Sequence, residues 1–176
     1  MRPRQPLPRL WLMTDERMGE RLWDALARLP RGSGVIFRHY HTRERRALFE
    51  RVRAIARRRG LVLLLAGTPR EAAGWRADGA HGRSLHLRAS RPLLRTAPAH
   101  DARELNRARA HAALVSPVFT TRSHRGAHSL GPLRFGMLAR RARIALIALG
   151  GMNARRFDRL VPLGAYGWAA IDSLHT

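Results

Sequence analysis

Short apolar runs alternate with amphipathic stretches along the whole chain. Eight of these runs are predicted strands, and they comprise Leu10–Met13, Val35–Phe37, Leu61–Leu65, Ala77–Gly82, Leu93–Ala97, Ala113–Phe119, Ile144–Leu149 and Tyr166–Ile171. Leu61–Leu65 is apolar at every position, which is typical of a strand that is buried on both faces of a parallel sheet. Ala77–Gly82 has the weakest pattern of the eight.

Residues at helical spacing follow most of these strands, and turn residues mark where the helices begin and end. The predicted helices run from Met18 to Leu29 ahead of Pro30 and Gly32, from a cap at Thr42 to Gly60, over Pro69–Arg76, from a cap at Asp101 to Ala112, over Leu133–Arg141, and from a cap at Asn153 to Gly164. Asp101 and Glu104 have the spacing of a capping box. Between Ala80 and Leu93 there is room for a loop but not for a full helix.

Eight alternating strand and helix units favour an α/β fold, the (β/α)8 TIM barrel, with an open doubly wound sheet as the alternative. Barrels of this kind typically have about 250 residues and rarely fewer than about 200. At 176 residues the chain predicts a shortened barrel, in which the helix after the fourth strand is reduced to a loop. With 45% hydrophobic residues and no linker or repeat, residues 1–176 are expected to form one domain around a single core.

The composition excludes several kinds of chemistry. Because Cys is absent, the chain has no disulfide, no thiolate nucleophile and no Cys-bound zinc. Lys is also absent, which excludes a Schiff base and a lysine phosphate clamp. No apolar run approaches the roughly 20 residues of a membrane span, and the N-terminal residues contain no apolar signal core, so a cytoplasmic location is expected.

All 34 basic residues are Arg, and the formal net charge is +22. The arginines are spread along the predicted helices and are not gathered in one block of sequence, and aromatic residues make up only 6% of the chain. Stacking platforms for bases are therefore scarce. These patterns favour a solvated surface that attracts polyanions weakly, with nucleic-acid binding as the minor alternative.

Three late segments indicate a phosphate site. They are the hydroxyl- and glycine-rich stretch Ser116–Leu133, the strand that ends in Gly150 and Gly151, and the strand that ends in Ile171. Small residues and backbone N–H donors at the carboxyl ends of late, adjacent parallel strands are what a barrel uses to bind phosphate. The sequence therefore predicts a phosphorylated small-molecule ligand.

Seven motifs follow one another along the chain: LMTD at 12–15, ADGAH at 77–81, AHDARE at 99–104, SPVFTTRSH at 116–124, LGPL at 130–133, ALGGMNA at 148–154 and GAYGWAAIDSL at 164–174. In this order they resemble the thiamine phosphate synthase superfamily, which includes the synthases and the related thiazole tautomerases. The resemblance covers nearly the whole chain and is most specific from Ser116 onward. It implies a (β/α)8 barrel and a ligand that carries a thiazole ethyl phosphate.

On this resemblance, the half of the site that holds the thiazole phosphate is mostly present. Thr121-Arg122-Ser123 matches the family's T-x-T hydroxyl pair, and Gly150-Gly151 matches its glycine after the seventh strand, where a missing Cβ lets phosphate approach the backbone. Ile171-Asp172 matches the final Ile-Ser pair. Asp172 places a carboxylate beside a dianion, for which Arg122 or Ser173 would have to compensate.

The half that binds the aminopyrimidine diphosphate and Mg²⁺ in the synthases is largely missing. Its strand-two residues are matched by Ile36, Arg38 and Tyr40, its strand-three Asn-Asp by Ala66 and Gly67, its strand-four Asp by residues 82–84, and its sixth-loop lysine by His124. A magnesium site needs carboxylates, and a diphosphate leaving group needs its charge neutralised. No metal is therefore expected, and Arg38 and His124 remain as candidate substrate contacts.

His100 ends the fifth predicted strand, directly before Asp101. The resemblance places it where the tautomerases carry the histidine that moves a proton to aromatise a thiazole carboxylate phosphate, and synthases often have a histidine there as well. An imidazole can accept a carbon-bound proton and return it elsewhere on the ligand. The alternative for His100 is a capping or packing role. His39, His41 and His81 could form a cluster at the strand ends, with metal binding as a minor alternative.

The expected function is therefore an enzyme of thiamine biosynthesis that isomerises a thiazole phosphate with His100 as acid and base and without a cofactor. One alternative is a thiamine phosphate synthase that uses Mg²⁺ to condense hydroxymethylpyrimidine diphosphate with thiazole phosphate. The other is a non-catalytic protein that binds thiazole or thiamine phosphate. The small-molecule phosphate is the expected partner, with no membrane and no specific nucleic acid, and a homo-oligomer is compatible with the sequence.

Overall fold

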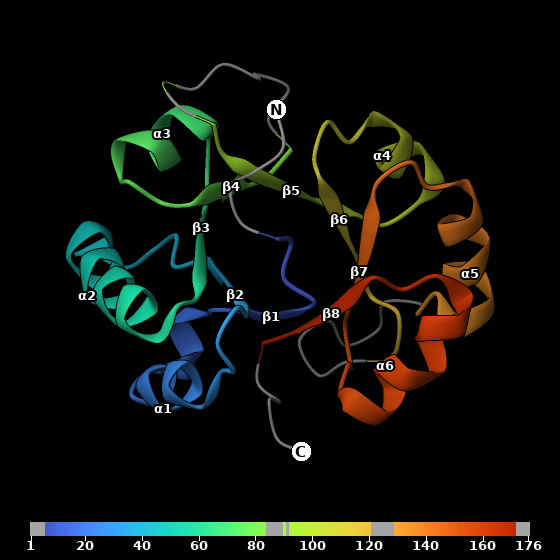
Figure 1. The fold of residues 1–176 in the computed structure, drawn as a ribbon, viewed down its shortest axis with the longest axis horizontal. Coiled ribbons are helices and arrows are strands. Elements are labelled where there is room, and N and C mark those ends of the chain that lie inside the picture. The colour runs from blue at the N-terminus through green and yellow to red at the C-terminus, as the bar shows by residue number, and fades with distance from the viewer. Residues whose placement is uncertain (1–5, 84–89, 91, 121–128, 172–176) are drawn as a thin grey trace.

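The computed structural model describes residues 6–83, 90, 92–120 and 129–171. Eight parallel strands pair in chain order and close into a barrel, β1-β2-β3-β4-β5-β6-β7-β8, with β8 hydrogen-bonded to β1 (Figure 1). The strands are β1 (Leu10–Met13), β2 (Gly34–Phe37), β3 (Val62–Ala66), β4 (Gly79–His81), β5 (Leu94–Ala99), β6 (Ala112–Val115), β7 (Ala145–Leu149) and β8 (Gly167–Ala170). Closure confirms the predicted (β/α)8 barrel and rules out the open sheet.

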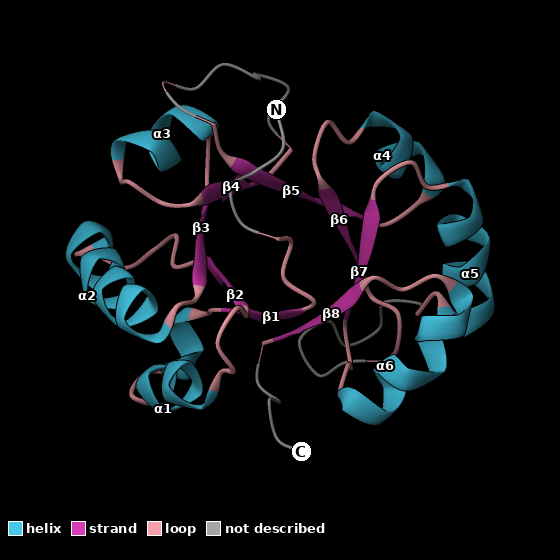
Figure 2. Cartoon of the chain, in the orientation of Figure 1, coloured by secondary structure: helices cyan, strands magenta, loops and turns pink. Residues whose placement is uncertain are grey.

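Helices follow most of the strands and lie on the outside of the barrel (Figure 2). They are η1 (Glu16–Met18), α1 (Arg21–Arg28), α2 (Arg45–Arg59), α3 (Pro69–Gly74), α4 (Ala102–Arg107), α5 (Gly131–Arg141), α6 (Ala154–Leu160) and η3 (Val161–Leu163). Among the described residues, no helix is long and apolar enough to cross a bilayer.

Alternate strand residues divide between two apolar layers. One layer fills the barrel and includes Trp11, Ile36, Leu64 and Ile147, all buried. The other lies between the strands and the helices. Trp11 is the largest side chain inside, and its indole N–H donates to the Pro8 carbonyl at 2.8 Å. The period of two that sorts these layers also decides which polar residues face the barrel axis at the strand ends.

Several strand and helix ends differ from the sequence prediction, and two of them have a clear cause in the backbone. The predicted strand Ala113–Phe119 is wrong beyond Val115, because Pro117 has no N–H to continue the ladder. The predicted helix from Met18 to Leu29 is interrupted, because Gly19 has a φ of 49° and separates η1 from α1. A residue in that region cannot continue a right-handed helix.

Helix caps are partly as predicted. The side chains of Asp101 and Asn153 accept the first-turn N–H groups of α4 and α6, and Gly60 and Gly164 end α2 and η3 in the left-handed conformation. The Thr42 cap is wrong, since the N-cap of α2 is Glu44 and carries no side-chain hydrogen bond. The extension of α4 to Ala112 is also wrong, because that residue begins β6.

The short connection between β4 and β5 comprises residues 82–93. The predicted loop in place of a helix falls mostly on residues 84–89 and 91, which lie outside the described part of the chain. The described residues of this connection are not helical.

We expect Gly34→Ala to destabilise the fold by about 1–3 kcal/mol, because its new methyl group would overlap the buried ring of Trp11. Gly74→Ala is the matched control. It lies in α3 with open space around its Cβ position and should be neutral or stabilise by up to about 1 kcal/mol. Urea denaturation midpoints measure both effects. Equal stability of the two variants would show that the Trp11 contact does not constrain the barrel.

Candidate functional site

The carboxyl ends of all eight strands meet at one end of the barrel, here called the mouth. Alternation along β1, β2 and β4 turns the side chains of Asp15, Arg38 and His81 toward the barrel axis, in register with buried Met13, Ile36 and Gly79. The mouth is therefore lined by ionisable groups above an apolar barrel interior. This is where active sites lie in TIM-barrel enzymes.

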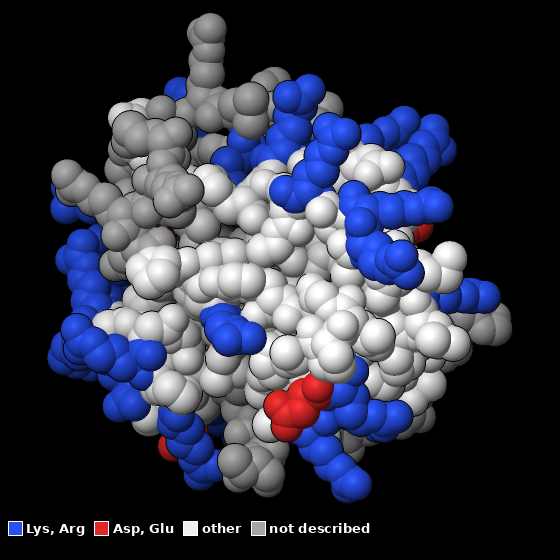
Figure 3. Space-filling view, turned by 45° about the vertical axis from the view of Figure 1, so that its right-hand side comes forward, with Lys and Arg blue, Asp and Glu red and all other residues white. Residues whose placement is uncertain are grey.

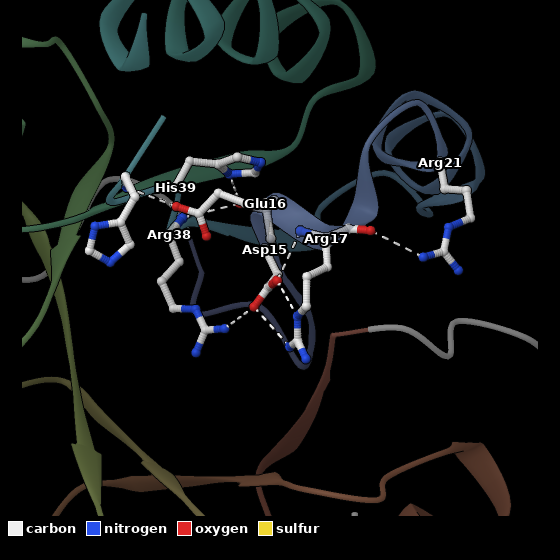
Figure 4. A network of polar contacts seen from close by, with 8 residues as sticks. Asp15, Glu16, Arg17, Arg21, Arg38 and His39 are labelled. Carbon is white, nitrogen blue, oxygen red and sulfur yellow. Dashed lines mark hydrogen bonds and ion pairs between the residues drawn. The ribbon is translucent and has the colours of Figure 1, made fainter. Parts of the chain in front are cut away.

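Asp15 is the centre of an ion-pair network (Figure 4). Its carboxylate, 8% exposed, accepts a hydrogen bond from Arg17 Nε at 2.7 Å and pairs with Arg38. The hydrogen bond from the Arg17 side chain, together with the Arg17 backbone N–H and the Arg38 guanidinium, holds the pKa of Asp15 well below its usual range. The carboxylate is thus charged at neutral pH and orients Arg38 at the mouth.

His39 lies on the other side of β2, between the strands and α2. Its ring stacks on Phe37 at a centroid distance of 4.8 Å, and its Nδ1 lies 3.0 Å from the hydroxyl oxygen of Thr14. The same hydroxyl accepts the Arg38 backbone N–H at 3.1 Å, so its proton is directed to His39. Burial lowers the pKa of His39. His39 is therefore a packed, neutral group.

His81 is buried at the end of β4. Its Nδ1 lies 2.9 Å from the Thr96 hydroxyl oxygen on β5. Burial lowers the pKa of His81 to about 4, and the nearby Arg38 cation contributes. His81 faces the barrel axis, whereas His39 faces the helices and His41 is exposed. The predicted cluster of these three histidines is therefore wrong, and the described residues hold no group of three side chains suited to a metal ion.

Arg45 joins the ends of two strands, a role that the sequence did not indicate. Its guanidinium donates to the His39 carbonyl at 2.5 Å and the Ala66 carbonyl at 2.7 Å, and it pairs with Glu71 at 3.0 Å. Ala66 is one of the positions where the synthases are expected to carry their Asn-Asp pair. Because other arginines surround Arg45 in the sequence, no sequence pattern marked it as a residue of the site.

His100 follows β5 and is held from two sides. Its Nδ1 lies 2.6 Å from the Ser116 carbonyl oxygen at the end of β6, which requires that Nδ1 donates the proton. Its backbone N–H donates to Glu104 at 2.9 Å, while Glu104 N–H donates to the capping Asp101 at 2.7 Å. The exposed ring therefore has its Nδ1 occupied and its Nε2 lone pair available. The predicted cap at Asp101 is confirmed, whereas Glu104 accepts the N–H of His100 and not that of the N-cap residue, as a capping box would require.

Gly150 and Gly151 pack the end of β7 against residues 117–120. Both have positive φ, 92° and 59°. A Cβ on Gly150 would lie 2.8 Å from Pro117 Cα, and a Cβ on Gly151 would lie 2.5 Å from the Thr120 carbonyl oxygen. The close approach of this loop therefore requires glycine at both positions, and the predicted phosphate contact of the two residues stays a prediction.

Of the remaining predicted ligand contacts, one is described by the structure and the others are not. Ile171 follows β8 and packs, half-buried, against the apolar interior of the barrel. Thr121, Arg122, Ser123, His124 and Asp172 lie outside the described residues, so their predicted roles stay predictions.

A magnesium ion does not fit the described mouth. Apart from the exposed helix N-cap residues Glu20 and Glu44, the described carboxylates there are engaged: Asp15 by Arg17 and Arg38, Glu16 by His41 N–H, Glu71 by Arg45, Asp101 by Glu104 N–H, and Glu104 by Arg83 and His100 N–H. On strands three and four, the positions that the resemblance matches to metal and diphosphate ligands carry Ala66, Gly67, Gly82 and Arg83. Mg²⁺ requires oxygen ligands that these residues do not offer.

A cavity of about 240 Å³ lies along the outer face of β4 and β5, and its lining extends from Arg109 and Ala110 to Gly67, Gly82 and Glu104 near the mouth. Small residues such as Ala80 and Ala97 form its walls together with Arg95 and Arg107. It contains none of the predicted site residues.

The closed barrel with ionisable groups at its mouth defines a TIM-barrel protein with an enzyme-like site. The family model for thiamine monophosphate synthase matches residues 10–174, and the chain belongs to this family. No match is found among curated proteins.

Solved structures of the same fold include two thiamine phosphate pyrophosphorylases. The one from Pyrococcus furiosus is 20% identical with a TM-score of 0.74, over 94% of this chain and 86% of that one. The one from Bacteroides thetaiotaomicron is 15% identical with a TM-score of 0.60, over 93% and 82%. A glycerol uptake operon antiterminator regulatory protein from Listeria monocytogenes, 12% identical with a TM-score of 0.62 over 98% and 96%, shows that this likeness concerns the fold alone.

His81 should make stability depend on pH. Its pKa is about 4 in the fold against 6.5 as a free group, so below pH 6.5 the unfolded chain takes up a proton that the fold rejects. The stabilisation is complete above pH 6.5 and is lost as the pH falls toward 4, by up to roughly 3 kcal/mol. Urea midpoints at several pH values should show a smaller decline for His81→Gln. His41→Gln, the exposed control, should decline like the wild type, and an unchanged decline in His81→Gln would refute the assignment.

Proposed function

We propose that the protein isomerises a thiazole carboxylate phosphate by metal-independent proton transfer, with His100 as acid and base. The observation that carries this proposal is the 2.6 Å hydrogen bond from His100 Nδ1 to the Ser116 carbonyl, which leaves Nε2 as the basic atom of an exposed ring at the mouth. Family membership supports a thiamine-related phosphate as the ligand class.

The step uses only this side chain and the substrate. Nε2 takes a proton from a ring carbon of the thiazole precursor, and the electron pair of that C–H bond moves into the ring. The imidazolium, whose Nδ1–H remains bonded to the Ser116 carbonyl, then returns the proton to another position. No atom is gained or lost, and the product is the aromatic tautomer.

Substrate binding is assigned to the phosphate half of the site. Its members are Thr121, Arg122, Ser123, His124, Gly150, Gly151, Ile171 and Asp172, with Arg38 as the cation at the mouth. Arg38 is oriented by its ion pair with Asp15 and is one quarter exposed, so it can also meet an anionic group of the ligand.

The synthase reaction is the second candidate, because the family is named for it. It requires Mg²⁺ for a diphosphate leaving group, and the described carboxylates of the mouth are engaged by arginines and backbone N–H groups. A binding protein without turnover is the third. Turnover separates the third candidate from the first two, and magnesium dependence separates those two.

His100→Asn should lower turnover of the thiazole carboxylate phosphate at least about 100-fold, because general acid–base groups typically contribute about 10²–10⁴-fold. Binding of the phosphate ligand should remain near the wild-type value. His41→Asn, the same substitution at an exposed histidine to which no ligand contact is assigned, should leave turnover unchanged, because His41 contacts Glu16 through its backbone N–H. Chelator should have no effect.

Three results would reject the isomerase proposal. Full isomerase activity in His100→Asn would show that His100 is not the acid and base. Condensation of the aminopyrimidine diphosphate with thiazole phosphate, only in the presence of Mg²⁺, would assign synthase activity instead. Ligand binding without turnover in either reaction would show that the protein only binds its ligand.

Thr121→Val combined with Ser123→Ala should abolish the thermal stabilisation by thiazole phosphate, because both hydroxyl donors to the phosphate are removed. A bound ligand at 100 times its Kd stabilises by about 2.7 kcal/mol, which a melting curve detects readily. Gly150→Asp is a poorer test, since any side chain there collides with Pro117. If the double variant keeps the full shift, the phosphate binds elsewhere.

A further inference from the structure

Charge is distributed unequally along the barrel axis. Because all strands are parallel, the loops and helix ends that lead into them gather opposite the mouth, at what we call the basal end. The basal arginines are Arg9, Arg28, Arg31, Arg57, Arg58, Arg59, Arg76, Arg107, Arg109, Arg140, Arg141, Arg143 and Arg159, and all are exposed. They lie in the segments that lead into seven of the eight strands, all except β5, so they surround the barrel axis.

Acidic residues are concentrated at the other end. Those at or near the mouth are Asp15, Glu16, Glu20, Glu44, Glu71, Asp101 and Glu104. Within the described chain, the acidic residues at the basal end are Asp158, beside Arg159 in the last turn of α6, and Asp78, one of whose oxygens accepts Leu63 N–H at 2.8 Å. The ion pairs found among described residues use Arg17, Arg38, Arg45, Arg46, Arg53 and Arg83, and none of the basal arginines.

Helix dipoles explain only part of this pattern. The dipole stabilises a cation in the last turn of a helix, which accounts for residues such as Arg28 and Arg107. Arg31, Arg76 and Arg143 lie in loops outside any helix, so the dipole does not account for them, and the last turn of α2 places three cations at consecutive positions 57–59. The guanidinium groups of such a surface repel one another unless bound anions neutralise them.

We propose that the basal end binds the phosphate backbone of nucleic acid without reading its sequence. Guanidinium groups match phosphate bidentately, and their spread around the axis suits an extended polyanion better than a small one. Figure 3 shows how far basic side chains outnumber acidic ones on the face in view.

The same surface is less suited to a membrane or to base recognition. Among the exposed large apolar side chains of the described residues, Val161 lies near the basal end, whereas Tyr40, Leu133 and Met137 lie elsewhere. An interfacial anchor needs an apolar face to insert, and base stacking needs exposed aromatic rings. Contacts with phosphate groups are therefore the binding mode that this surface supports.

The geometry also separates this surface from the candidate catalytic site. The mouth is at the opposite end of the strands, so a polyanion at the basal end leaves His100 accessible. Both ligands should bind at once. The inference does not rest on the proposed isomerisation.

The test measures fluorescence anisotropy of two short duplexes of unrelated sequence between about 50 and about 200 mM salt. The basal variant carries Arg57→Gln, Arg58→Gln, Arg140→Gln and Arg141→Gln, and the control carries Arg43→Gln, Arg70→Gln, Arg103→Gln and Arg155→Gln. Both lose four exposed charges that form no ion pair with another described residue. The slope of log K against log salt should become shallower by up to about 3.6 in the basal variant alone, with at least about tenfold weaker binding at low salt.

Equal losses in the two variants would overturn the proposal, because the charge would then act without a defined surface. A clear preference for one duplex would also overturn it, as would binding to anionic vesicles but not to duplex. Melting temperatures near that of the wild type verify that both variants fold. His100→Asn should bind duplex normally, so failure of the catalytic proposal is distinguishable from failure of this one.

Discussion

The pairing of β8 with β1 is the interaction on which the rest of the structure depends. It places Leu10 beside Trp168 and Leu12 beside Ala170, and it leaves no unpaired strand edge in the barrel. Once the ring is closed with every strand parallel, all carboxyl ends must share one face. Residues as distant in sequence as Asp15 and His100 are thereby held at the same mouth, although each follows its own strand by only a residue or two.

Much of this fold could be predicted from the sequence, because its signals are local. Apolar runs such as Leu61–Leu65 mark doubly buried strands, and short side chains such as Asn153 cap helices within one turn. The ends of elements were less predictable where one residue acts through its backbone. Gly19 divides a helix whose apolar spacing is continuous, and Pro117 ends a strand whose hydrophobicity is continuous.

The site was predictable to a lesser degree, since its contacts join different strands. The motif order located His100, but the Ser116 carbonyl that fixes its tautomer is a backbone group with no sequence signature. Arg45 was indistinguishable from the arginines around it, and only the packing of α2 brings it to the Ala66 carbonyl. His39 and His81 looked alike in sequence, yet a period of two sends one toward the helices and the other toward the axis.

The mouth also shows how one charged residue limits the chemistry of its neighbours. Asp15 is the carboxylate most deeply placed there, and two guanidinium groups already satisfy it. Its charge therefore stabilises Arg38 and is not offered to a metal ion, while Arg38 in turn lowers the pKa of buried His81. Asp15 and His81 are therefore both fixed in their protonation states near neutral pH. His100 differs from them, because its ring is exposed and both of its described contacts, with the carbonyl and the hydroxyl of Ser116, are made through Nδ1.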